Sequence, residues 1–231
     1  MSEPEVLRTT VGDLPLEEVE LDLAGRTWNV LHTGAIITHA DEERFLRGEE
    51  LKLPYGIVLW PAAIALAHEL ATRDVKGLRV LELGAGTGLP GIVAAARGAQ
   101  VVQTDRQELV LHLCRMNAQR NGAPMILHRI ADWTEWRDND RYDLILGSDI
   151  LYAPGLHTAV RHIFESNLAP GGRLLVADPF RAASVAMLEG MERTGWRVSM
   201  TKWTVGITPP PRNIGVFEVT RGEGLRAAGA R

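Results

Sequence analysis

Between residues 78 and 105 the spacing of apolar positions changes along the chain. A short, nearly continuous apolar run at 79–83 predicts a buried strand, and a glycine-rich turn follows it at once. Helix-forming residues at 92–97 and a second apolar run at 100–104 complete a strand–turn–helix–strand unit that ends at Asp105. Such a unit places backbone N–H groups and a helix N-terminus at the carboxyl edge of a parallel sheet, where nucleotide-like ligands bind.

Downstream, helical and strand-like spacing alternate, which predicts one doubly wound α/β domain. Pro61 suits the first turn of a helix, and the three prolines at 209–211 exclude helix between the last two strands. We expect a Rossmann-like sheet of seven strands, mostly parallel with an antiparallel last strand. The other helices are expected at 61–71, 108–121, 155–168 and 182–194, and the other strands at 125–130, 142–147, 173–177 (after a turn at 170–172), 196–205 and 213–220.

The N-terminal part of the chain forms an addition to that domain. Residues 1–15 are polar, and we expect them to be loosely ordered. Between residues 17 and 33 apolar side chains alternate with charges on either side of Ala24-Gly25, which predicts a β-hairpin. A charged segment at 41–50 predicts a short helix with a solvated face. The chain is therefore divided into an N-terminal extension (1–52), a main domain (53–220) and a flexible Gly/Ala/Arg-rich tail (221–231).

Composition disfavours several classes of protein. The 231 residues carry a formal net charge of −4, which gives no electrostatic case for nucleic acid. The one cysteine, Cys114, excludes an intrachain disulfide and a cysteine-rich metal site, and the seven histidines show no compact ligand motif. No secretory signal or membrane-length apolar run is present, so we expect a soluble, cytoplasmic protein that uses no metal.

The glycine turn indicates which ligand binds. Gly84, Gly86 and Gly88 form G-x-G-x-G, whereas a dinucleotide fingerprint needs G-x-G-x-x-G. Glu82 precedes the first glycine by two positions, and Asp105 ends the next strand. This pattern resembles the first motif of the class I (seven-β-strand) S-adenosylmethionine-dependent methyltransferases. The alternative is a glycine turn that only packs a helix against a strand.

The resemblance implies binding roles for the residues of these motifs. In that family the glycine turn lies against the methionine end of the cofactor, and the acidic residue after the second strand holds the ribose hydroxyls. Asp105 suits this role because a carboxylate accepts two hydroxyl hydrogen bonds. In the same family an acidic residue after the third strand bonds the adenine amino group, and a neighbouring side chain packs on the adenine ring. These roles are implied for Asp132 and Trp133. For Asp132 the alternative is a solvated charge or a helix cap. The implied cofactor residues of these motifs are Glu82, Gly84, Ala85, Gly86, Gly88, Asp105, Asp132 and Trp133.

Three further motifs resemble one branch of that family, the lysine-methyltransferase-like enzymes. They are W-P-A-A from Trp60, N-A-x-x-N-G from Asn117, and the D-x-x-Y spacing of Asp149 and Tyr152. In this branch the first segment covers the cofactor pocket, so Trp60 is implied as part of its wall; the alternative is a core aromatic. The end of the fourth strand faces the transferring methyl, which implies cofactor contact for Ser148 and catalytic roles for Asp149 and Tyr152. A helix cap at Asp149 and simple packing of Tyr152 are the alternatives.

The resemblance predicts a methyltransferase that moves the methyl of S-adenosylmethionine to a lysine amine of a protein and releases S-adenosylhomocysteine. A carboxylate favours the ammonium form of lysine, so we assign Asp149 to capturing and orienting the lysine and not to a base role. The hairpin at 17–33 and the loop at 208–213 are expected to contact the acceptor protein. Nucleic-acid amino methyltransferases typically carry [DN]-P-P-[YF] at this strand end, and residues 149–152 lack those prolines. A small-molecule N- or O-methyltransferase and a non-catalytic cofactor-binding module stay open, whereas Leu89, in the place of a third glycine, disfavours an oxidoreductase.

Overall fold

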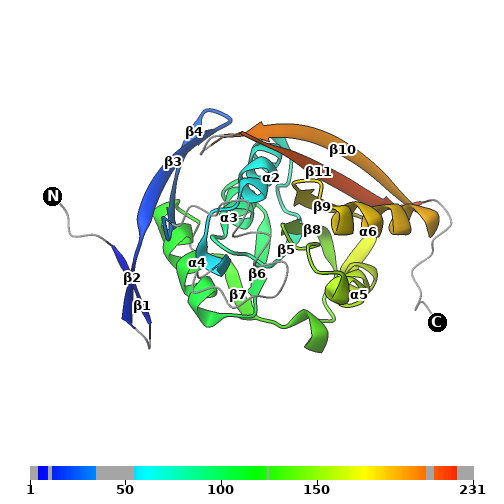
Figure 1. Ribbon diagram of the computed structural model, residues 1–231, viewed down its shortest axis with the longest axis horizontal. Coiled ribbons are helices and arrows are strands. Elements are labelled where there is room, and N and C mark those ends of the chain that lie inside the picture. The colour runs from blue at the N-terminus through cyan, green and yellow to red at the C-terminus, as the bar shows by residue number, and fades with distance from the viewer. Residues whose placement is uncertain (1–4, 10–11, 35–54, 124, 207–210, 223–231) are drawn as a thin grey trace.

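The computed structural model describes residues 5–9, 12–34, 55–123, 125–206 and 211–222. A seven-stranded sheet with helices on both faces forms its centre (Figure 1). The strands of this sheet are β5 (Arg79–Leu83), β6 (Gln100–Asp105), β7 (Leu127–Ile130), β8 (Tyr142–Ser148), β9 (Leu168–Asp178), β10 (Trp196–Val205) and β11 (Arg212–Arg221). The helices are α2 (Pro61–Thr72), α3 (Leu89–Ala96), α4 (Glu108–Arg120), α5 (His157–Asn167) and α6 (Ala182–Arg193), with short 3-10 helices η1 (Tyr55–Ile57), η2 (Trp133–Glu135) and η3 (Pro154–Leu156).

The strand order across the sheet is β10-β11-β9-β8-β5-β6-β7. The neighbouring pairs among β5 to β9 are parallel, and β11 runs antiparallel to both β9 and β10. The predicted sheet, mostly parallel with an antiparallel last strand, is therefore confirmed. The chain passes from β5 to β6 and β7 on one side and then builds β8 and β9 on the other. This reversal makes the carboxyl end of β5 the switch point of the sheet, where α/β proteins open a ligand crevice.

Successive side chains of β5 point into two different hydrophobic clusters, which explains why helices cover both faces. Val80 packs in the cluster that contains α2 and α3, whereas Leu81 packs in the cluster that contains α5 and α6. α4 lies beside α3 and contacts β6 and β7. α2 begins at Pro61, as predicted, because the missing N–H of proline removes no hydrogen bond in the first turn of a helix.

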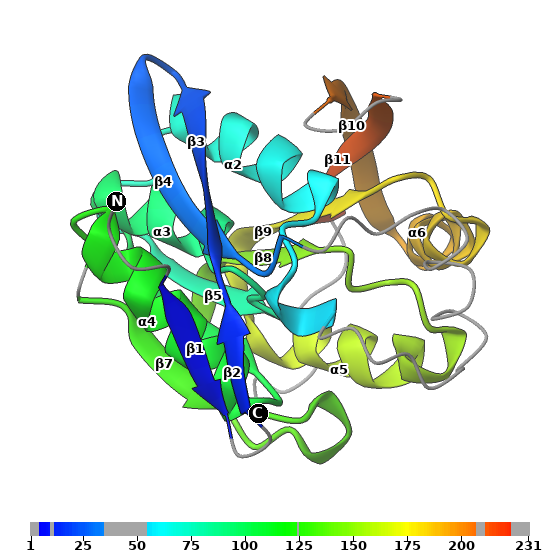
Figure 2. The ribbon, with the colours of Figure 1, turned by 60° about the vertical axis from the view of Figure 1, so that its left-hand side comes forward.

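The predicted N-terminal hairpin is confirmed. β3 (Glu17–Leu23) and β4 (Arg26–His32) pair antiparallel across the turn at Ala24-Gly25. The hairpin lies along α2 and α4 (Figure 2). Trp28 and Val30 are buried in the same hydrophobic cluster as α2 and α3. The hairpin therefore shares the core of the main domain.

Two asparagines of the N-A-x-x-N-G motif on α4 attach the hairpin. Asn117 accepts the backbone N–H of Leu31 (2.8 Å) and donates to its carbonyl (3.0 Å). Asn121 makes the same pair of bonds with Asn29, at 3.0 and 2.7 Å. Asn117 also donates to the carbonyl of Thr87 in the glycine turn, at 2.9 Å. One buried amide therefore bonds both to the hairpin and to the turn.

Residues 6–9 and 12–15 do not form the loosely ordered segment that their polarity predicts. β1 (Val6–Thr9) and β2 (Gly12–Pro15) pair antiparallel. Leu7 and Leu16 are buried in a small cluster with side chains of α4. Burial of these two leucines stabilises the β1–β2 pair. The sequence does not predict this, because polar residues stand around each leucine.

Several boundaries also differ from the prediction. α3 begins at Leu89, three residues before the predicted helix. The expected turn at 170–172 lies inside β9, beside a shift of register against β8. Arg221, assigned to the tail, is the last residue of β11. The expected helix at 41–50, the tail from residue 223 and residues 208–210 of the expected acceptor loop lie outside the described residues. None of the helices in the described part of the chain is both long and apolar enough to cross a lipid bilayer.

Candidate active site

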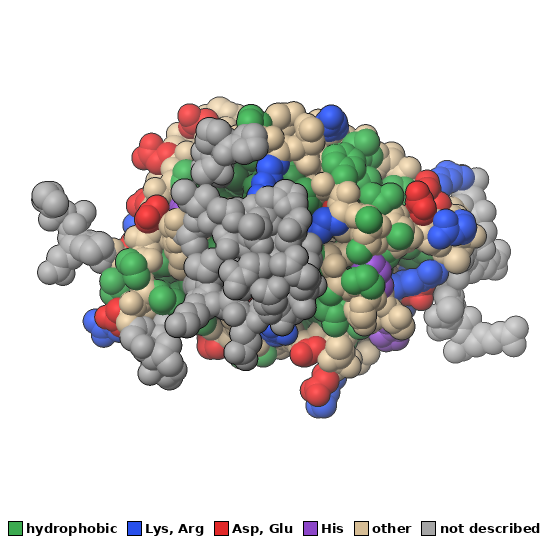
Figure 3. Space-filling model, in the orientation of Figure 1, with side chains coloured by type: hydrophobic (Ala, Val, Ile, Leu, Met, Phe, Trp, Pro, Cys, Tyr) green, Lys and Arg blue, Asp and Glu red, His purple; other side chains and the backbone are tan. Residues whose placement is uncertain are grey.

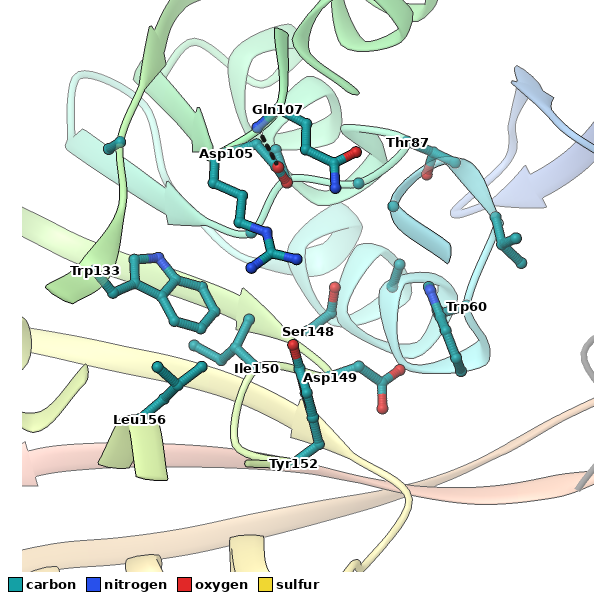
Figure 4. A pocket seen from close by; sticks show the side chains of 18 of the residues that line it. Trp60, Thr87, Asp105, Gln107, Trp133, Ser148, Asp149, Ile150, Tyr152 and Leu156 are labelled. Atoms are coloured by element: carbon teal, nitrogen blue, oxygen red, sulfur yellow. Dashed lines mark hydrogen bonds between the residues drawn. The ribbon is translucent and has the colours of Figure 1, made fainter. Parts of the chain in front are cut away.

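A cavity of about 440 Å³ lies at the carboxyl ends of β5, β6 and β8, at the switch point of the sheet. Its volume falls in the range of small-molecule and cofactor sites. Figure 4 shows that the labelled side chains reach a common space from several elements. The main parts of its wall are the glycine turn (84–87), residues 105–107 after β6, residues 131–134 after β7, residues 148–150 with Tyr152 after β8, Trp60 before α2, and Arg181 before α6.

The glycine turn forms one side of the cavity with its backbone. Gly84 and Gly86 have φ angles of 62° and 57°, a region that glycine occupies without the steric cost of a Cβ. A Cβ on Gly84 would lie 3.2 Å from Cζ2 of Trp133 and 3.1 Å from Cγ2 of Ile150. The turn therefore passes close to the indole ring, and a side chain at residue 84 would crowd it. Gly88 alone among the four predicted turn residues does not line the cavity, because it immediately precedes α3.

Glu82 lies behind the turn and is not part of the cavity wall, and its predicted contact with the cofactor stays a prediction. Its carboxyl group accepts hydrogen bonds from Nε2 of Gln103 (2.6 Å) and from the backbone N–H of Gly91 (3.2 Å). Nε2 of Gln103 also donates to the carbonyl of Gly88 (2.7 Å). Burial raises the pKa of Glu82 to about 8, although the two donors oppose the shift. Glu82 points to the same face as Val80 because side chains alternate along a strand, so it supports the turn from beneath α3.

Asp105 ends β6 and lines the cavity. Its carboxylate accepts the backbone N–H of Gln107 at 3.1 Å (Figure 4). Burial raises the pKa of Asp105, while backbone N–H groups, including those of Gln107 and Gly86, oppose that shift. A carboxylate held in this way by backbone donors keeps lone pairs for further hydroxyl donors. Its place agrees with the predicted ribose ligand, and the contact itself stays a prediction.

Asp132 and Trp133 lie on the wall formed after β7. Oδ1 of Asp132 accepts the hydroxyl (2.6 Å) and the backbone N–H (2.8 Å) of Thr134, and these bonds lower the pKa of Asp132. This is the helix cap weighed as an alternative, here at the start of η2. Figure 4 shows the ring of Trp133 beside Ile150 and Leu156. Together they form a flat apolar wall at this end of the cavity, and adenine contact stays a prediction.

Asp149, Tyr152 and Trp60 lie at the opposite end. In Figure 4 the carboxylate of Asp149 lies between the rings of Tyr152 and Trp60, with Ser148 nearby. Burial raises the pKa of the Tyr152 phenol, so the group is a protonated hydrogen-bond donor at neutral pH. The helices that follow, η3 and α5, have no side-chain cap, so Asp149 does not have the capping role weighed as its alternative. The fold therefore brings the W-P-A-A and D-x-x-Y motifs together.

Arg181 was not predicted and lies on the same wall. Its guanidinium pairs with Asp149, and its Nη1 lies 3.0 Å from Oδ2 of Asp178. The hydroxyl of Ser184 donates to the same Asp178 oxygen at 2.6 Å. Asp149 and Arg181 are 32 positions apart on different loops, so no local pattern in the sequence reveals the pair.

A family model described as "Lysine methyltransferase" matches residues 40–184, more than half of the chain. The chain belongs to this lysine methyltransferase family. The match includes the glycine turn, Asp105 and the D-x-x-Y residues. Membership in the lysine methyltransferase family confirms the predicted resemblance to that branch.

Curated relatives show the same relationship. The chain is 38% identical over 137 residues to the Histone-arginine methyltransferase METTL23 of Mus musculus, covering 56% of this chain and 51% of that protein. It is 42% identical over 108 residues to the Protein N-lysine methyltransferase METTL21A of Xenopus tropicalis, covering 44% of this chain and 50% of that protein. The aligned part thus spans about half the length of these relatives.

Solved structures show the fold. The ribosomal protein L11 methylase of Lactobacillus delbrueckii subsp. bulgaricus matches with a TM-score of 0.56 and 24% identity, covering 70% of this chain and 79% of that one. A putative SAM-dependent methyltransferase of Streptococcus mutans matches with a TM-score of 0.63 and 15% identity, covering 88% of this chain and 55% of that one. At these identities the likeness concerns the fold alone.

Proposed function

We propose that this protein binds S-adenosylmethionine in the cavity and transfers its methyl group to a lysine amine of another protein. The observation that carries the proposal is the joining of two sets of residues in one cavity. The glycine turn, Asp105 and Trp133 lie on one part of its wall, and Asp149, Tyr152 and Trp60 lie at the other end. The first set suits the cofactor, and the second suits an amine acceptor.

The residues present fit the cofactor. The Asp105 carboxylate would accept the two ribose hydroxyls, while the backbone of the turn at Gly84–Thr87 would face the methionine part. The flat ring of Trp133 would stack on adenine. A Cβ on Gly84 would crowd that ring, which is consistent with a wall that a flat ligand approaches closely. Bound there, the cofactor supplies an electrophilic methyl on a positively charged sulfur.

The acceptor end has to bind a cationic side chain and favour its neutral form. A lysine amine has an ordinary pKa of about 10.4 and attacks only after losing a proton. Desolvation between Trp60 and Tyr152 would lower that pKa. The new N–C bond forms as the S–C bond breaks in an in-line displacement, so positioning by Asp149 and Tyr152 carries much of the rate.

A protein acceptor is supported by the family and by the surface. Acidic and basic side chains are interspersed over the described part of the face in Figure 3, whereas nucleic acid favours a continuous basic surface. The names of the two relatives include both lysine and arginine methylation. We favour lysine because the matching family model carries that description. No group of three or more His, Cys, Asp or Glu side chains in the described ranges is arranged to hold a metal ion.

The cofactor half is tested by calorimetric titration with S-adenosylhomocysteine. Wild type should bind it, and Asp105→Ala should bind at least about tenfold more weakly, because it loses two hydrogen bonds to hydroxyl groups. Asp140→Ala is the matched control, since Asp140 is exposed and does not belong to the cavity wall. A folded wild type that binds no S-adenosylhomocysteine contradicts the whole proposal.

The acceptor half is tested with methyl-tritiated S-adenosylmethionine in a cell extract, followed by acid hydrolysis of the labelled protein. Nε-methyllysine is the expected product. Methylarginine would replace the lysine assignment, and label only in small molecules would favour a small-molecule methyltransferase. Tight cofactor binding with no labelled product of any kind would favour a non-catalytic module.

A further inference from the structure

Two residues with strained backbone lie at a charged cluster at the acceptor end of the cavity. Among the described residues, Ala24, Asp149 and Phe180 are the non-glycine residues with positive φ. The first lies in the hairpin turn, while Asp149 (55°) and Phe180 (65°) lie at the ends of β8 and β9. Such backbone strain is unfavourable and concentrates at functional sites. Here the two strained positions bring neighbouring loops together, with the N–H of Asp149 bonded to the carbonyl of Ala177 at 2.9 Å.

Among the described residues, the charged cluster consists of Asp149, Asp178 and Arg181. The guanidinium of Arg181 pairs with both carboxylates, and its backbone N–H donates to Oδ1 of Asp178 at 2.7 Å. The exposed fractions of the side chains are 10% for Asp149, 1% for Asp178 and 12% for Arg181. Charges so nearly buried are little screened by salt. The cluster is therefore a carboxylate–guanidinium–carboxylate arrangement made within the chain itself.

We propose that Arg181 is a positioning residue that fixes the Asp149 carboxylate and offsets its charge, so that the site takes a lysine that enters as a neutral amine. This inference rests on the proposed function. A carboxylate without its countercharge would hold the acceptor as an ammonium ion, which cannot attack. An acceptor guanidinium stays charged and needs carboxylates. Here both carboxylates already bind the guanidinium of the chain, which favours lysine over arginine.

The proposed charge balance predicts an effect that needs no acceptor. S-adenosylmethionine carries a positive sulfur, whereas S-adenosylhomocysteine carries a neutral one. Removing the charge of Arg181 leaves Asp149 and Asp178 less compensated, and this favours the cationic ligand alone. We divide the dissociation constant of S-adenosylhomocysteine by that of S-adenosylmethionine. This ratio should therefore rise by about fivefold in Arg181→Gln. A role limited to folding or packing would change both affinities together.

The experiment measures both dissociation constants by calorimetry at 150 mM salt for wild type and three variants. Arg181→Gln removes the charge, and Arg181→Lys keeps it and should restore most of the wild-type ratio. Arg161→Gln is the matched control, because it removes the same charge from an arginine that pairs with Glu165 on α5, outside the cavity wall. Its ratio should equal that of wild type. Circular dichroism melting checks that each variant is folded.

The outcomes separate this inference from the proposed function. A folded wild type that binds neither ligand contradicts the proposed function. A wild type that binds both, with an unchanged ratio in Arg181→Gln or the same change in Arg161→Gln, overturns only the role of Arg181. If Arg181→Gln does not fold, Asp149→Asn decides: a lowered ratio supports the inference and an unchanged ratio overturns it. Methylarginine as the product of the tritium assay would overturn the preference for lysine.

Discussion

Replacing Glu82 with glutamine tests how the glycine turn is supported from behind. The carboxyl group is fully buried, and its hydrogen-bond donors among the described residues are the neutral groups of Gln103 and Gly91. Burial disfavours the charged form and raises the pKa of Glu82 from its ordinary 4.5 to about 8. At pH 7 the folded protein therefore holds Glu82 protonated, whereas the unfolded chain ionises it. Glutamine has the same shape and stays neutral in both states.

The expected size of the effect follows from the two pKa values. Between pH 4.5 and about 8 the folded state binds the extra proton, so the stability of wild type falls as pH rises through that window. Each pH unit above 4.5 in this window lowers the unfolding free energy of wild type by about 1.4 kcal/mol. Glu82→Gln should therefore be about 3 kcal/mol more stable than wild type at pH 7. Below pH 4.5 the gain should vanish, because both states of wild type are then protonated.

The assay is urea unfolding followed by tryptophan fluorescence at pH 5, 6, 7 and 8. The difference in unfolding free energy between Glu82→Gln and wild type should grow steadily across that range. Glu20→Gln, at an exposed position on β3, is the control and should stay within about 0.5 kcal/mol of wild type throughout. A difference for Glu82→Gln that does not depend on pH, or a variant less stable than wild type at pH 7, would refute the account of Glu82 as a buried neutral acid.

Two other substitutions test the turn and the hairpin. Gly84→Ala should lose at least about tenfold in S-adenosylhomocysteine affinity by calorimetry, because its Cβ would crowd Trp133. Gly25→Ala is the control, because its backbone is similarly strained (φ 78°) but the space around it is open. It should lose about 1 kcal/mol of stability and keep the wild-type affinity. Equal affinities for the two variants would contradict this reading of the cavity wall. Asn117→Ala removes three buried hydrogen bonds and should cost about 3 kcal/mol in urea unfolding, compared with less than about 0.5 kcal/mol for the exposed Gln119→Ala on the same helix. A loss below about 1 kcal/mol in Asn117→Ala would show that the hairpin is held by other contacts.

The sheet was predictable from sequence because its signals are local. The apolar run at 79–83, the glycines and the acidic end of β6 each lie within one short stretch, and their order defines the unit. The position of Glu82 behind the turn was also accessible, because it shares a strand face with the buried Val80. The ion pair of Asp149 and Arg181 was not predictable from sequence, because it depends on the approach of two loops that follow different strands.

The third hydrogen bond of Asn117 links two segments that are distant in the sequence. The amide holds the edge of β4 at Leu31 and the carbonyl of Thr87 in the glycine turn at the same time. A protein partner that pulls the hairpin away from α4 would therefore also free the turn on the cofactor side. Thermodynamic linkage is reciprocal, so binding of the cofactor would also strengthen the attachment of the hairpin to α4.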